Sequence, residues 1–378
     1  MKKKILIMYA SYGSGHKAIA NYIKEYINKN NDDIEVATLD ILTNSMSGVG
    51  SISQKVNSFF MLKTPWIHNL FYDITSTKIG GDVIDSISMT IFKNKKMENS
   101  IKKYNPDIVI ATHFFGASLT KYYNDKGITN AKIITVVTDY DIVELWIKYH
   151  ESIDSIVVAS KTMERDLIKR GVSKDKIKVF GIPVAPNTDH KFNRKAALKK
   201  YNLKGNNPIC VFFGGGGNGN SKTIPYIKRL VRHNKDIDFI FVAGKNELSK
   251  NIMEEYMIRH NLNNIRVLGF SDKIPELLEL SDFVISKPGG IQLTECLYFN
   301  KPVFMITNSG GQEIANYKYF EHKGYGKYFK TSWGLNKYIS NLSNNKKILE
   351  KIRTNMQNDP REDAIGALYN LICEYLKD

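Results

Sequence analysis

The chain has 378 residues, and its 54 Lys and Arg against 38 Asp and Glu give a formal net charge of +16. At roughly 150 residues per domain this length predicts two domains, and a hydrophobic content of 42% excludes a disordered or fibrous chain. Three widely spaced cysteines without a CxxC pair argue against a disulfide scaffold or zinc knuckle, so we expect a reducing cytosol. The positive charge favours anionic partners, although a Lys- and Asn-rich genome would also produce it.

The first residues resemble a secretory signal only superficially. Three lysines at 2–4 precede the apolar run ILIMYA, which is too short for a signal sequence and lacks a small-residue cleavage site. No stretch approaches the roughly 18 apolar residues that cross a bilayer. We therefore expect a protein that is neither exported nor membrane-spanning.

Two series of short apolar runs rich in β-branched residues alternate with segments whose apolar residues have helical spacing. The first series predicts strands at 4–9, 107–112, 132–138, 155–160 and 176–181, and the second at 208–217, 238–244, 264–270, 282–290 and 301–307. The intervening segments are long enough for helices, such as one over 223–234. Each series therefore predicts a parallel, doubly wound α/β sheet.

The segment 181–207 is rich in Pro, Asn and Lys, and we expect few core contacts there. It predicts a domain junction near Gly181–Asn187. Two α/β domains joined in this way form a cleft, and ligands of such sheets bind at the carboxyl ends of the strands. We therefore expect the functional site to lie between the domains.

Residues 43–104 contain no convincing strand and interrupt the first series. An apolar and aromatic cluster at 59–74 is followed at 91–104 by five lysines and one glutamate. Aromatic rings beside lysines suit a bilayer interface with anionic lipid. The alternative, which composition alone favours, is a helical insertion packed on its own domain with a solvated lysine face.

Three glycine turns follow predicted strands. At 11–23, Gly13 and Gly15 allow close backbone approach, and a helix start at His16 would direct N–H groups and a positive dipole at an anion. His16 itself suits proton transfer. An ordinary strand-to-helix turn with an exposed histidine is the alternative.

The second turn, at 212–223, carries four consecutive glycines, whose entropic cost suggests a loop pressed against a phosphate. We reject a Walker A loop because Ser221 stands where glycine is required. In the third, at 286–295, a glycine pair can admit a pyrophosphate to the helix start. Glu295, expected in the second helical turn, can accept hydrogen bonds from ribose hydroxyls. Gln312 and Glu313 are expected at the start of a further helix, and their polar side chains suit the binding of sugar hydroxyls. The alternative is that Glu295 and Glu313 are ordinary helix-capping acids.

Asp139, Tyr140 and Asp141 spell the DxD pattern of metal-dependent glycosyltransferases. No further ligands cluster nearby, so we predict no metal site. Asp139 follows a strand and would orient a base or bind an acceptor hydroxyl, with an ordinary turn aspartate as the alternative.

Together, SYGSGHKA, FGGGGNG, VLGF and SKPGGIQLTE…NSGGQE resemble glycosyltransferase family 28, in its branch of monogalactosyldiacylglycerol synthases and processive diacylglycerol glucosyltransferases. The resemblance spans nearly the whole chain. It implies a GT-B fold of two Rossmann-like domains facing a cleft. Residues 1–183, with the insertion 43–104, would face acceptor and membrane, 184–360 would bind the nucleotide sugar, and a helix at 361–378 would pack back towards the first domain.

The resemblance also implies roles for individual residues. His16 would be the catalytic base, assisted by Asp139, with Gly15, His113 and Trp146 on the acceptor side. The donor-binding residues would be Gly215, Gly216, Gly217, Asn218, Phe270, Ser271, Gly289, Gly290, Glu295, Gln312 and Glu313. Many plant-type members have an alanine-glycine-proline-glycine run where this chain has Lys287-Pro288-Gly289-Gly290, which leaves the sugar and acceptor open.

The implied activity is inverting transfer of a hexose from a UDP-sugar to diacylglycerol or a glycosyl-diacylglycerol, without a metal or other cofactor. The enzyme would be cytoplasmic and peripheral on the inner face of the cell membrane, with an anionic lipid surface and no nucleic acid as partner. The alternatives are a peptidoglycan-precursor-type GlcNAc transferase or sugar-nucleotide epimerase of the same fold, and a non-enzymatic binder of anionic surfaces.

Overall fold

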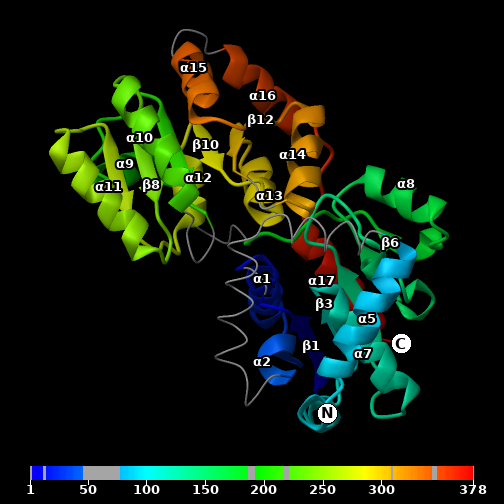
Figure 1. Ribbon diagram of the computed structural model, residues 1–378. Coiled ribbons are helices and arrows are strands. Elements are labelled where there is room, and N and C mark those ends of the chain that lie inside the picture. The colour runs from blue at the N-terminus through cyan, green and yellow to red at the C-terminus, as the bar shows by residue number, and fades with distance from the viewer. Residues whose placement is uncertain are drawn as a thin grey trace. The chain divides into compact units, whose positions relative to one another are not determined.

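The computed structural model describes residues 2–11, 14–45, 77–185, 192–215, 221–307, 310–342 and 347–377. The chain divides into two compact units (Figure 1). The first comprises Met1–Pro186, Ser309–Gln312 and Arg361–Asp378, and the second comprises Asn187–Asn308 and Glu313–Pro360.

The first unit is built on a six-stranded parallel sheet of order β2-β1-β3-β4-β5-β6. Its strands are β1 (Lys3–Tyr9), β2 (Ile34–Asp40), β3 (Ile108–Ala111), β4 (Lys132–Val136), β5 (Ser155–Val157) and β6 (Ile177–Lys178). The strand order reverses between β1 and β3, which makes the carboxyl ends of these two strands the topological switch point of the sheet.

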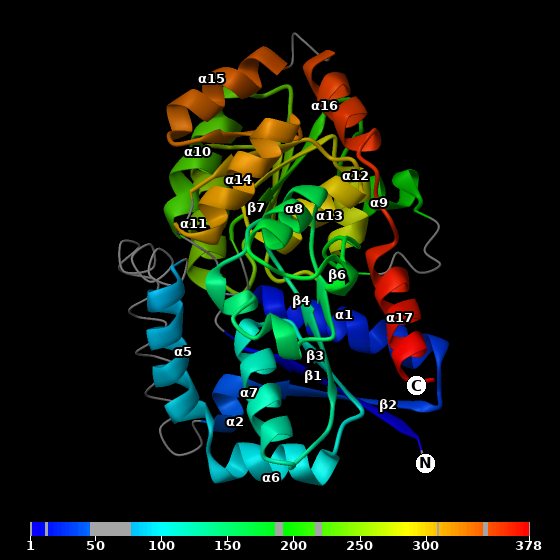
Figure 2. The ribbon, with the colours of Figure 1, turned by 90° about the vertical axis from the view of Figure 1, so that its right-hand side faces the viewer.

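Helices cover both faces of this sheet. They are α1 (Ser14–Asn30), α2 (Ile41–Ser45), α5 (Lys78–Phe92), α6 (Lys95–Tyr104), α7 (Phe114–Asp125), α8 (Lys161–Lys169) and α17 (Ala364–Tyr375). α1 packs on β1, β2 and α17, whereas α7 packs on β3 and β4 and carries α5 on its outer side (Figure 2). A Cβ at Gly116 would lie 2.9 Å from the Ala111 Cβ, so glycine lets α7 sit close to β3.

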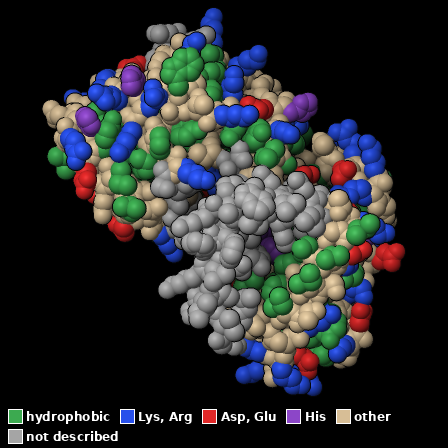
Figure 3. All heavy atoms as spheres, viewed as in Figure 1, with side chains coloured by type: hydrophobic (Ala, Val, Ile, Leu, Met, Phe, Trp, Pro, Cys, Tyr) green, Lys and Arg blue, Asp and Glu red, His purple; other side chains and the backbone are tan. Residues whose placement is uncertain are grey.

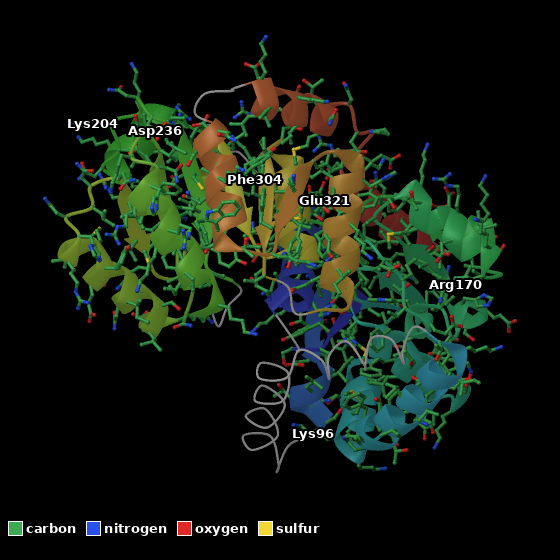
Figure 4. All side chains as sticks on the ribbon, turned by 45° about the horizontal axis from the view of Figure 1, so that its top comes forward. Lys96, Arg170, Lys204, Asp236, Phe304 and Glu321 are labelled. Atoms are coloured by element: carbon green, nitrogen blue, oxygen red, sulfur yellow. The ribbon has the colours of Figure 1, made fainter. Side chains whose placement is uncertain are left out.

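The second unit repeats the architecture with a six-stranded parallel sheet of order β12-β11-β10-β7-β8-β9. Its strands are β7 (Ile209–Phe213), β8 (Asp238–Val242), β9 (Ile265–Leu268), β10 (Phe283–Ser286), β11 (Val303–Ile306) and β12 (Gly326–Phe329). Fully buried phenylalanines fill its core, including Phe304 on β11 (Figure 4). The switch point of this sheet lies between β10 and β7.

The helices of this unit are α9 (Arg194–Lys200), α10 (Ile224–His233), α11 (Glu247–Arg259), α12 (Ile274–Leu280), α13 (Gly290–Tyr298), α14 (Gln312–Lys323), α15 (Ser332–Leu342) and α16 (Lys347–Gln357). Two parallel doubly wound α/β sheets are what the apolar runs predict. The helix predicted over 223–234 is present as α10. Among the described residues, none of the helices has both the length and the apolarity to span a bilayer.

The structure differs from the predictions in three places. The edge strands β2 and β12 are not predicted, because each keeps a half-exposed pattern without a continuous apolar run. The expectation of few core contacts across 181–207 is wrong, since α9 packs on α12 and buries Ala197. α1 begins at Ser14 and not at His16, which puts His16 in its first turn. The aromatic cluster predicted at 59–74 lies outside the described residues.

Candidate active site

In the first unit, polar groups from three adjacent strands meet at the carboxyl edge of the sheet. His16 follows β1 in the first turn of α1, Thr112 directly follows β3, and Thr138 follows β4. His16 Nδ1 lies 2.6 Å from the Thr112 carbonyl oxygen and 3.2 Å from Thr138 Oγ1. Thr112 Oγ1 also donates to the His16 carbonyl oxygen at 3.1 Å. The histidine is thereby held from both its ring and its backbone at the switch point of the sheet.

These contacts fix the tautomer of His16. A carbonyl oxygen can only accept, so the proton of the neutral ring resides on Nδ1 and the lone pair on Nε2. Burial lowers the pKa of His16 below its ordinary value of 6.5, against the opposing effects of Asp139 and the Thr112 carbonyl. The ring is therefore neutral at pH 7, with Nε2 able to take a proton.

His113 lies against His16, with 4.9 Å between the ring centroids. It caps α7, and its Nδ1 accepts from the Phe115 N–H at 3.4 Å. Burial, and secondarily the neighbouring His16, lower the pKa of His113 well below 6.5. This residue is thus a second neutral imidazole beside the first.

An aromatic cluster extends from His113. Its ring lies 4.1 Å from that of Phe114, and Phe114 meets Trp146 edge-on at 5.7 Å between centroids. Trp146 is buried in the short 3₁₀ turn Glu144–Trp146 after β4. The structure therefore places His113 beside His16 and joins Trp146 to them through Phe114, and the acceptor-side role of His113 and Trp146 stays a prediction. Gly15 lies one residue before His16 within α1.

Asp139 lies three residues after β4, at a strand end as predicted. Its Oδ2 accepts from Thr138 Oγ1 at 3.5 Å, and its charge raises the pKa of His16. The residues that the structure describes hold no group of three His, Cys, Asp or Glu placed to bind a metal ion. The metal-free reaction remains a prediction.

Most of the predicted donor-binding residues follow β7, β10 and β11, which are neighbours in the second sheet, whereas Phe270 and Ser271 follow β9 at its edge. The glycine turn after β7 begins with Gly214, whose missing Cβ would lie 3.0 Å from the Phe241 ring, and Gly215, whose φ of 104° suits glycine alone. Thr223 Oγ1 donates to the Gly214 carbonyl at 3.1 Å and anchors the turn. Gly216, Gly217 and Asn218 lie outside the described residues.

The turn after β10 places Gly289 as the N-cap and Gly290 as the first residue of α13. Gly289 has φ −74° and ψ 138°, which any residue adopts, and a Cβ there would find no atom within 4 Å. Neither backbone strain nor packing within the described chain requires glycine at 289, which leaves space for a ligand at the start of a helix.

Glu295 lies in the second turn of α13, as predicted, and is only 6% exposed. Gln292 Nε2 donates to its Oε2 at 3.5 Å. A buried carboxylate on the helix that follows Gly289 is a strong acceptor for hydroxyl groups.

α14 follows β11 and begins at Gln312 and Glu313, where the sequence predicts a helix start. Lys287 Nζ lies 2.8 Å from Glu313 Oε1, and both side chains are largely buried. The buried Asn316 donates from Nδ2 to the Pro288 carbonyl at 3.0 Å. These two contacts join the turn after β10 to the first turns of α14.

Phe270 and Ser271 follow β9. The Phe270 ring is 66% exposed and has Lys245 Nζ 5.3 Å from its centroid. Ser271 Oγ accepts from the Lys273 N–H at 3.1 Å, which shapes the turn. An exposed aromatic ring at the carboxyl edge of a sheet suits stacking on a nucleobase.

The predictions do not include Thr112, Thr138 or Lys287 as functional residues. Thr112 and Lys287 come directly after β3 and β10, and Thr138 comes two residues after β4. A charged residue at a strand end is a signal that could have identified Lys287, whereas the two threonines lie within the predicted strands.

Two family models match the chain. The model described as monogalactosyldiacylglycerol (MGDG) synthase matches residues 16–184, and the glycosyltransferase family 28 C-terminal domain matches residues 209–366. The chain belongs to glycosyltransferase family 28. Among similar proteins, the processive diacylglycerol beta-glucosyltransferase of Bacillus pumilus is 26% identical over 358 residues, which cover 94% of this chain and 90% of that protein.

Solved structures agree on the architecture of this family 28 member. MurG from Acinetobacter baumannii matches with a TM-score of 0.64 and 12% identity, over 98% of this chain and 99% of MurG. MnaA from S. aureus, solved with UDP, matches with a TM-score of 0.63 and 15% identity, over all of this chain and 97% of MnaA. The predicted GT-B fold is confirmed.

Proposed function

We propose that this protein is an inverting glycosyltransferase that moves a hexose from a UDP-sugar to diacylglycerol or a glycosyl-diacylglycerol at a membrane surface. The observation that carries the proposal is the state of His16, a neutral imidazole with its proton on Nδ1 and its lone pair on Nε2 at a sheet switch point. Similar family members are named processive diacylglycerol beta-glucosyltransferases. MnaA, which has a similar fold, was solved in complex with UDP.

The chemistry is a direct displacement at the anomeric carbon. His16 Nε2 takes the proton of the acceptor hydroxyl as its oxygen bonds to the anomeric carbon. The bond from that carbon to the diphosphate oxygen breaks, and its electron pair leaves with UDP. Attack opposite the leaving group inverts the centre, so an α-linked donor yields a β-glycoside.

The second unit holds the donor and stabilises the leaving diphosphate. The start of α13 supplies backbone N–H groups and a positive dipole beside Gly289 and Gly290. Glu295 accepts from the ribose hydroxyls, Phe270 lies beside the uracil, and Gln312 and Glu313 hold the sugar. Because backbone amides and a helix terminus balance the developing charge, the proposed reaction needs no metal.

Membrane binding is proposed to use α5 and α6. Ile79, Val83, Ile87 and Ile91 on α5 are 80%, 51%, 56% and 47% exposed, and their spacing of four residues puts them along one side of the helix. Figure 3 shows hydrophobic side chains gathered over this helix. The opposite side buries Asp85, Met89 and Phe92.

The charges near α5 favour an anionic bilayer. The two acids of α5, Asp82 and Asp85, both lie 3.0 Å from Lys148 Nζ. Lysines at 93, 95, 96, 102 and 103 are all exposed, and Lys96 on α6 is labelled in Figure 4. Each lysine near anionic lipid contributes about 1 kcal/mol. We propose that this side of the first unit lies on the inner face of the cell membrane.

Product analysis tests the function. The purified protein is incubated with diacylglycerol vesicles, mixed UDP-sugars and a metal chelator, and the lipids are examined by mass spectrometry. We expect a lipid heavier by one or more hexoses, in the β configuration by NMR, and none with His16→Ala. Folded protein that makes no glycolipid from any UDP-sugar would refute the proposal.

A further inference from the structure

Thr138 lies between the ring of His16 and the carboxylate of Asp139. Its Oγ1 is 3.2 Å from His16 Nδ1 and 3.5 Å from Asp139 Oδ2. Because the Thr112 carbonyl keeps the proton on Nδ1, the Thr138 oxygen accepts from the ring and its own hydrogen points to the carboxylate. The order of contacts is therefore imidazole, hydroxyl, carboxylate.

The position of Thr138 favours a specific role for its hydroxyl. The residue is 4% exposed, so the hydroxyl needs partners within the protein. The hydrogen bonds that the structure gives it, among the described residues, go to His16 and Asp139. A valine would fill the same volume, so packing alone does not require the oxygen atom.

We propose that Thr138 is a positioning residue that orients His16 and connects it to the negative charge of Asp139. The proposal rests on the proposed role of His16 as the base. When Nε2 takes the acceptor proton, the ring becomes an imidazolium with two N–H groups. The Thr112 carbonyl and Thr138 Oγ1 then share the Nδ1 proton, and Asp139 polarises the hydroxyl.

The charged and titratable groups around His16 set the direction of the effect. Asp139, after β4, raises the pKa of His16, whereas His113, at the cap of α7, is itself a neutral imidazole. Removal of the Thr138 oxygen takes away an acceptor that stabilises the charged ring. The pKa of His16 must then fall, and the base becomes weaker.

The test compares Thr138→Val, which keeps the shape and loses the hydroxyl, with Thr138→Ser, which keeps the hydroxyl. The protein is labelled with ¹⁵N in its histidine rings, and His16→Gln assigns the His16 signals. In Thr138→Val we expect the His16 pKa to fall by about one unit and kcat to fall about tenfold, with KM for the donor unchanged. Thr138→Ser should retain both values. An unchanged His16 pKa in Thr138→Val, or equal losses in Thr138→Ser, would overturn the proposal.

A second variant separates the relay from an independent action of Asp139. If the carboxylate acts through the hydroxyl, Asp139→Asn should lower the His16 pKa less in the Thr138→Val background than in the wild type. Additive effects would contradict the relay. The NMR titration needs no substrate. A shifted pKa without glycolipid product would refute only the proposed function, whereas product with an unshifted pKa would refute only the relay.

Discussion

Replacement of Val83 and Ile87 by glutamine should weaken the binding of the protein to anionic vesicles. Both side chains lie on the exposed stripe of α5, away from the side that buries Met89 and Phe92. Glutamine favours helix at least as well as the two β-branched residues it replaces, so α5 should persist. The change therefore removes apolar surface without removing the helix.

The size of the effect follows from the exposure of the two residues. Full burial of a Val or Ile side chain contributes about 1.5–3 kcal/mol. Val83 is 51% exposed and Ile87 is 56% exposed, so about half of each side chain remains to be buried. Insertion of both into a bilayer interface contributes about 2 kcal/mol, and the double variant should bind vesicles about 30-fold more weakly.

Vesicle flotation with a lipid titration measures this change. The matched control replaces Leu248 and Ile258 on α11 of the second unit, which are 65% and 76% exposed, by glutamine. The control removes more exposed apolar surface than the test variant. If general surface hydrophobicity drove binding, the control would lose more affinity.

The expected outcome is therefore specific to α5. The Val83/Ile87 variant should be released from vesicles while the Leu248/Ile258 variant binds like the wild type. Equal binding by the Val83/Ile87 variant and the wild type, or equal losses in both variants, would refute the assignment of the α5 stripe to the membrane.

Three further predictions concern the site. His16→Ala should lower kcat at least about 100-fold, the lower end of what a general base contributes, while calorimetry shows UDP binding unchanged; donor binding lost to the same degree would contradict the role of base. Gly289→Ala should change the free energy of unfolding by less than about 1 kcal/mol, because a Cβ there finds open space. The same change should weaken UDP binding about tenfold, and an unchanged affinity for UDP would place the diphosphate elsewhere. The pKa of both His16 and His113 is lowered on folding, so the unfolded chain takes up protons first as the pH falls below 6.5. Stability present above pH 6.5 should then be lost by about 1.4 kcal/mol per pH unit for each histidine until its folded pKa is reached, and urea unfolding of His113→Gln should show a weaker dependence on pH.

The central strands could be predicted from the sequence because they are buried on both sides and form continuous apolar runs. The edge strands β6 and β9 lie within predicted apolar runs, but the edge strands β2 and β12 could not be predicted, for physical reasons that differ. β2 (Ile34–Asp40) buries only Ile34 and Val36, exposes Glu35 between them and leaves residues 37–40 half-buried. β12 (Gly326–Phe329) is four residues long, with a glycine and a lysine. Each pairs with a single neighbouring strand, β2 with β1 and β12 with β11.

The site divides in a similar way. Glycine turns and charged residues after apolar runs stand out, and so His16, Asp139 and Glu295 could be predicted. Thr112 and Thr138 could not, because threonine is itself a good strand residue and both fell inside the predicted strands 107–112 and 132–138. The structure ends these strands at Ala111 and Val136. Both threonines therefore lie one or two residues beyond the strand ends, where they contact His16.

Lys287 shows how a departure from the family pattern bears on the sugar. It is the first residue of the run Lys287-Pro288-Gly289-Gly290, where the resemblance implies alanine in many plant-type members. Its Nζ lies 2.8 Å from Glu313 Oε1. The Glu313 carboxylate, paired with the lysine, can only accept hydrogen bonds. A sugar held at Glu313 must therefore offer hydroxyl donors to it and share the carboxylate with the ammonium group. In the proposed donor site, hydrogen-bond donors to the sugar then have to come from other groups, such as the Gln312 amide.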